Sequence, residues 1–90
     1  MKEQMKLNEV ALRYFGMLDM AGATPIRSKT PSTDDMHHLA WMLQQILYDG
    51  EQSLTKKHRW LGFVQACLIV AGFLTIDGER NATRYIFDGS

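Results

Sequence analysis

The sequence has few of the features that would place it directly in a known functional class. It contains one cysteine, Cys67, so no disulfide can form within the chain, and this usage is compatible with a reducing cytosol. Its ten basic residues balance ten acidic ones, leaving no net charge. A general nucleic-acid binder needs a basic excess, so the balance argues against duplex binding but allows one compact basic pocket.

Long hydrophobic runs are also lacking. The most apolar stretch, WLGFVQACLIVAGFL, contains Gln65 and is shorter than the roughly 20 residues that a membrane helix needs. The N-terminal MKEQMKLNEV is charged and lacks the apolar centre of a signal peptide. We therefore expect neither a membrane span nor a secretory leader.

The apolar residues recur at helical spacing, which predicts an all-α fold with three to four helices in a single domain, residues 1–90. Helices are expected over residues 7–21, 34–48 and 54–72, followed by a short fourth helix and an extended tail at Tyr85 to Phe87. Asn8 is the expected N-cap of the first helix. Ser32 or Thr33 would cap the second helix, with Asp34 and Asp35 in its first turn. Ser53 or Thr55 would cap the third helix and Thr75 the fourth. Gly22 and Gly72 are expected to end the first and third helices.

The third predicted helix is apolar nearly all round from Trp60 onward. Such a helix should be buried on most sides, which is difficult in a 90-residue monomer. We therefore expect a homo-oligomer.

A loop bracketed by Pro25 and Pro31 carries the first basic spot. Arg27 and Lys29 are two residues apart, so in an extended segment both point to one side and can hold one phosphate. The aromatic ring of Tyr14, on the preceding helix, would suit a nucleobase beside that phosphate. The alternatives are a solvated loop and ordinary core packing of Tyr14, which also fits the apolar stripe.

A second basic spot, KKHR at positions 56–59, opens the third helix. A solvated helix end is the commoner explanation for such a run. Cations at a helix N-terminus are disfavoured by the dipole, however, and a bound anion would relieve this.

Catalytic and metal-binding patterns are not found. His37 and His38 are adjacent and diverge on a helix, so they do not match the spacing of a zinc site. Cys67 has apolar neighbours and is expected to be a small core residue. We expect a protein that is not an enzyme and uses no metal or cofactor.

Several segments together resemble a known family: the helix KLNEVALRYF, Lys29 fifteen positions after Tyr14, LAWMLQQIL in the second helix and HRWLGFVQ in the third. They are similar to the phage anti-CBASS cyclic-oligonucleotide sponges, the anti-CBASS 2 family with homologues in T4-like phages. The resemblance implies a small helical homohexamer that works in the cytoplasm of the infected bacterial host. It would sequester cyclic di- and trinucleotides without cleaving them, and so block CBASS signalling.

The resemblance also implies roles for individual residues. Tyr14 would stack on a base of a cyclic dinucleotide lying between protomers, and Lys29 would hold a phosphate. Arg59 is the candidate for a separate cyclic trinucleotide site, where the family uses an arginine near the third helix. Arg27 and Thr30 are added to the dinucleotide site from the geometry of the loop alone.

Two other functions compete with this one. In a helix-turn-helix regulator, Lys56, Lys57 and Arg59 would bind DNA phosphates, but the third helix then offers only Gln65 to read bases. In an interaction adaptor, the apolar third helix would dock on a host protein.

Overall fold

The computed structural model describes residues 2–29 and 35–87 and has four helices in this part of the chain. They are α1 (Lys2–Met20), α2 (Met36–Tyr48), α3 (Leu54–Val70) and α4 (Ile76–Phe87). Within these two ranges there is no strand, so the all-α prediction is confirmed.

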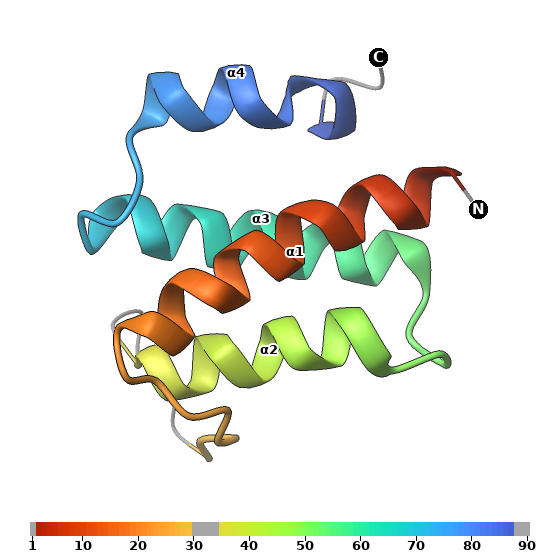
Figure 1. The fold of residues 1–90 in the computed structure, drawn as a ribbon. Helices are drawn as coiled ribbons and strands as arrows, with labels where there is room; N and C mark the ends of the chain where they lie inside the picture. The colour runs from red at the N-terminus through yellow and green to blue at the C-terminus, as the bar shows by residue number, and fades with distance from the viewer. Residues whose placement is uncertain (1, 30–34, 88–90) are drawn as a thin grey trace.

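The first three helices enclose the core, and α4 lies along one edge. α1 packs against both α2 and α3, α2 packs against α3, and α4 contacts α1 (Figure 1). Figure 1 shows α4 beyond α3, at the opposite edge from the loop between α1 and α2. The fully buried large side chains are Leu7, Tyr14, Leu18, Leu39, Leu43, Ile46, Leu61, Val64 and Leu68.

The starts of the helices differ in part from the prediction. α1 begins before Asn8, whose Oδ1 accepts a hydrogen bond from Gln4 Nε2 at 2.8 Å, so Asn8 is not the N-cap. The residues before it are mostly good helix formers, which extends the helix. Asp35, expected in the first turn of the second helix, is instead its N-cap and accepts from the His38 amide at 3.0 Å. The alternative caps Ser32 and Thr33 lie outside the described residues.

The other caps are confirmed. Ser53 Oγ accepts from the Lys56 amide at 3.1 Å, which selects Ser53 over Thr55 as the N-cap of α3. Thr75 Oγ1 accepts from the Gly78 amide at 3.2 Å at the start of α4.

Glycines end α1 and α3 as predicted. Gly22 and Gly72 have φ angles of 90° and 88°, which glycine adopts without steric cost. In each case the next amide turns back: Ala23 N donates to Leu18 O and Phe73 N to Leu68 O, both at 2.9 Å. The predicted extended tail at Tyr85 to Phe87 is wrong, because α4 continues through Phe87.

α3 is buried on one side only within the single chain. It buries Leu61, Val64 and Leu68, while Phe63 is 46% and Val70 82% exposed. The expectation that this helix is buried on most sides is therefore not met by one copy, and the oligomer stays a prediction. In the described part of the chain, no helix has the length and apolarity to span a bilayer.

Candidate functional site

The loop after α1 is fastened to the first turn of α2. Ile26 N donates to the carbonyl oxygen of His37 at 3.1 Å, and the amides of Thr24 and Ser28 donate to Nδ1 of His37 and His38 at 2.9 and 3.1 Å. These bonds hold the exposed Arg27 at a defined place, with its guanidinium carbon 5.3 Å from the centre of the Trp41 ring.

The contact between Arg27 and Trp41 is one end of a longer array. His38 stacks on Trp41 with ring centres 5.4 Å apart and an interplanar angle of 27°. Trp41 lies 5.9 Å from Trp60 of α3, and the Lys56 ammonium lies 4.9 Å from the Trp60 ring. We call Arg27, His38, Trp41, Trp60 and Lys56 the cation–aromatic array.

The array combines fixed rings with solvent-exposed charges. Both indoles are partly buried against the core, whereas Arg27 and Lys56 are exposed. Cations over indole faces are favourable contacts, and the same cations retain their attraction for phosphate. Aromatic rings beside basic residues are the usual chemistry for holding nucleobases and phosphates together.

The array joins two basic spots that the sequence keeps far apart. The loop cation Arg27 and the helix cation Lys56 are connected through the Trp41 and Trp60 rings because α2 and α3 pack against each other. The two tryptophans that connect them are functional candidates that sequence reasoning missed. Trp60 directly follows Arg59, and Trp41 lies three residues after His38, but only packing makes the two rings neighbours.

The other predicted site residues of the loop and of α3 differ in how far they are exposed to solvent. Lys29 and Arg59 are exposed, and Thr30 lies outside the described residues. The basic run at the start of α3 divides, because Lys57 is buried while Lys56 and Arg59 face solvent.

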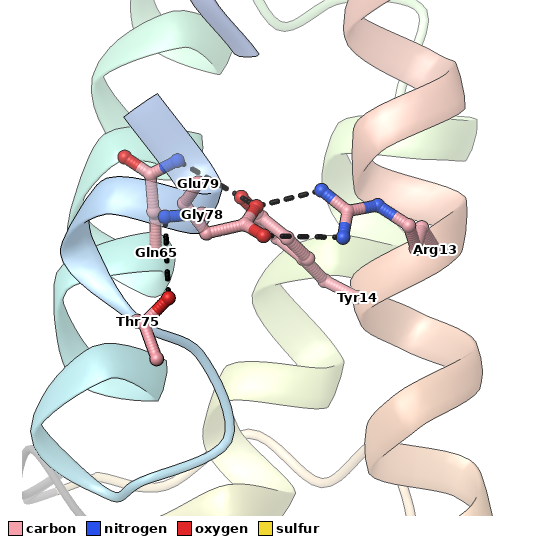
Figure 2. Close-up of polar contacts among 6 residues, drawn as sticks. All are labelled: Arg13, Tyr14, Gln65, Thr75, Gly78 and Glu79. Carbon is pink, nitrogen blue, oxygen red and sulfur yellow. Dashed lines mark hydrogen bonds and ion pairs between the residues drawn. The ribbon is translucent and has the colours of Figure 1, made fainter. Parts of the chain in front are cut away.

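Tyr14 lies in a buried polar cluster rather than at the loop. Its ring is fully buried, and its hydroxyl donates to Glu79 Oε1 at 2.7 Å and accepts from Gln65 Nε2 at 2.9 Å (Figure 2). Burial and the bond to Glu79 raise the pKa of the Tyr14 hydroxyl, so it stays protonated at neutral pH.

Arg13 completes this cluster from the neighbouring position on α1. Its two terminal nitrogens donate to the two carboxylate oxygens of Glu79 at 2.6 and 3.2 Å. Burial alone would raise the pKa of Glu79, but the bonds from Arg13 and Tyr14 outweigh it and hold that pKa below its usual range. Glu79 is therefore a buried carboxylate that keeps its charge.

Within one chain the two halves of the predicted dinucleotide site are directed to different places. The Tyr14 hydroxyl points to Gln65 of α3 and Glu79 of α4 (Figure 2), whereas the Arg27 guanidinium lies over the Trp41 ring on α2. The stacking role of Tyr14 stays a prediction, and in this conformation its ring presents no exposed face.

Cys67, the histidines and the acidic side chains are the other groups with the chemistry to form a site. Cys67 is buried, which raises the pKa of its thiol, and so it is the core residue that was predicted. Among the residues that the structure describes, no three histidine, cysteine or acidic side chains are grouped to hold a metal ion.

Comparisons with protein-family models, curated proteins and solved structures find no match for this chain.

Proposed function

We propose that this protein captures cyclic di- and trinucleotides and holds them without cleavage, which would block CBASS signalling in the cytoplasm of a phage-infected bacterium. The observation that supports it best is the cation–aromatic array, which offers two indoles between two exposed cations. A cyclic oligonucleotide has the matching chemistry, since its flat bases alternate with phosphate charges around a small ring.

In this proposal the array residues divide the work. Trp41 and Trp60 supply apolar surface for a base, while Arg27 and Lys56 bind phosphate oxygens on either side. Lys29 and Arg59, both exposed, are available to other phosphates of the same ligand or of a second one.

The proposal includes a homohexamer in which sites lie between protomers. The exposed apolar side of α3, with Phe63 and Val70, and the absence of net charge both favour association of copies. Repeated sites would give one assembly the capacity to deplete a signal without turnover.

Calorimetry with cyclic di- and trinucleotides tests the proposal. Arg27→Gln and Lys56→Gln should each weaken binding about tenfold, the loss expected for one charge-assisted hydrogen bond. Lys29→Gln tests the residue implied by the family resemblance. Arg80→Gln is the matched control, because it removes one exposed cation from α4, which lies at the opposite edge of the fold from α2 (Figure 1).

Fluorescence gives an independent readout. The two tryptophans of the chain both belong to the array, so a ligand there should change the intrinsic emission. The ligand should be recovered chemically intact by chromatography. Unchanged affinity in both Arg27→Gln and Lys56→Gln would remove the array from the site, and a cleaved ligand would contradict sequestration.

The rival regulator is distinguished by a titration with duplex DNA at several salt concentrations. Of its three proposed phosphate-binding residues, Lys57 is buried in this structure. A DNA-binding regulator requires affinity that falls steeply with salt. Such a slope, together with no response to cyclic nucleotides, would favour the regulator.

A further inference from the structure

The buried cluster of Figure 2 is built like an anion site that already holds an anion. Arg13 presents two donors and Tyr14 a third, and all three point at one carboxylate, that of Glu79. Gln65 in turn donates to the Tyr14 hydroxyl, which directs the hydroxyl proton toward the carboxylate. A fork of two nitrogens with an added hydroxyl is the donor set that binds phosphate oxygens as well as carboxylates.

The carboxylate belongs to α4, the helix at the edge of the fold (Figure 1). Among the side chains described in α4, residues 76–81, Glu79 is the buried one, while Ile76 is mainly exposed and Asp77 and Arg80 face solvent. α4 therefore carries an anion into the body of the protein on a peripheral helix.

Solvent reaches the cluster from the α1 side. The Arg13 side chain is 44% exposed, whereas that of Glu79 is 8% exposed. An anion arriving from solution can thus meet the guanidinium first, before the carboxylate has left.

We propose that Arg13 and Tyr14 form an oxyanion site for a phosphate group, which Glu79 occupies as a tethered internal ligand and from which a phosphate can displace it. Displacement releases α4 from α1 and uncovers the hydroxyl end of Tyr14. The proposal stands on the donor set and is independent of whether the cation–aromatic array binds cyclic nucleotides.

Tethering favours the Glu79 carboxylate in its competition with free phosphate for the donors of Arg13 and Tyr14, whereas charge favours the phosphate. A tethered carboxylate has an effective concentration in the millimolar range, which a free ligand must match. A phosphate dianion offsets this with its additional charge and acceptor oxygens. We therefore expect weak phosphate binding in the native protein and clearly tighter binding once the carboxylate is removed.

The test uses inorganic phosphate as the probe and calorimetry as the readout. Glu79→Ala should bind phosphate at least fivefold more tightly than the native protein. Asp77→Ala is the matched control, because it removes an exposed carboxylate from the same helix, and it should leave phosphate affinity unchanged. Adding Arg13→Gln to Glu79→Ala should abolish the gain.

Hydrogen exchange on the native protein provides the second measurement and does not depend on a variant that folds. Phosphate should speed exchange of the amides of α4, residues 76–87, and leave those of α2 unchanged. A second arm replaces phosphate with a cyclic dinucleotide, whose phosphates are diesters, to show whether the site takes free or nucleotide phosphate.

Each possible result of calorimetry and hydrogen exchange either supports or overturns the proposed oxyanion site. Faster exchange in α4 with either anion supports the proposal, as does the gain in Glu79→Ala that depends on Arg13. Equal phosphate affinity in Glu79→Ala and the native protein overturns it, and so does exchange in α4 that neither anion changes. Neither result bears on binding at the array.

Discussion

Tyr14 is a single residue whose position in the sequence allowed two interpretations. Its spacing fits both a core stripe and a ring beside a phosphate-binding loop, and the structure places the ring in the core. Burying the ring requires partners for its hydroxyl, and Gln65 and Glu79 supply them. A buried Glu79 then requires its own counterion, which is Arg13.

This chain of requirements predicts how the free energy of unfolding depends on pH. The native pKa of Glu79 is lowered, so the unfolded chain binds a proton there more readily. Its stabilising contribution is fully present above the ordinary glutamate pKa of about 4.3 and is lost as the pH falls toward the lowered native value. Thermal unfolding at pH 7 and pH 3 should show a larger loss for the native protein than for Glu79→Gln.

The control for this pH effect is Asp77→Asn, which alters an exposed carboxyl of the same helix. It should retain the full loss of the native protein. If Glu79→Gln and the native protein lose the same stability on acidification, the carboxylate does not stabilise the fold as described.

At the scale of helices, the sequence predicted a helix end correctly where one residue type marks it clearly, as glycine does. Glycines with positive φ ended α1 and α3 as predicted, because no other residue adopts that conformation so readily. Asn8 was misleading, because a cap-forming residue within a run of good helix formers does not stop a helix from extending past it. Tyr85 to Phe87 continue α4 although their sequence also suits an extended chain.

The N-cap of α3 yields a direct prediction. Ser53→Ala removes the acceptor for the Lys56 amide and should lower the free energy of unfolding by about 1 kcal/mol. Thr55→Ala, two residues further on, lies inside the helix and should leave that value unchanged or slightly raised, since alanine is the better helix former. Urea denaturation of the two variants measures both, and equal losses would show that Ser53 is not the cap.

At the scale of the molecule, the apolar side of α3 predicts self-association. Val70 and Met20 are each the last residue of a helix, α3 and α1, and are 82% and 90% exposed. If copies associate through α3, Val70→Gln should lower the mass measured by light scattering, while Met20→Gln should not. A native protein that remains monomeric at high concentration would contradict the oligomer and favour the adaptor.

The sequence by itself determined the helical class, the approximate helices and several of their ends, because periodicity, caps and glycines act over a few neighbouring residues. Within the described chain, only the tertiary structure decided which distant groups meet. Trp41 and Trp60 become neighbours through the packing of α2 on α3, and Glu79 reaches Arg13 and Tyr14 because α4 folds back along α1. Such contacts depend on how whole helices pack and on the partners that buried polar groups require. The spacing of neighbouring residues in the sequence predicts neither the packing nor the partners.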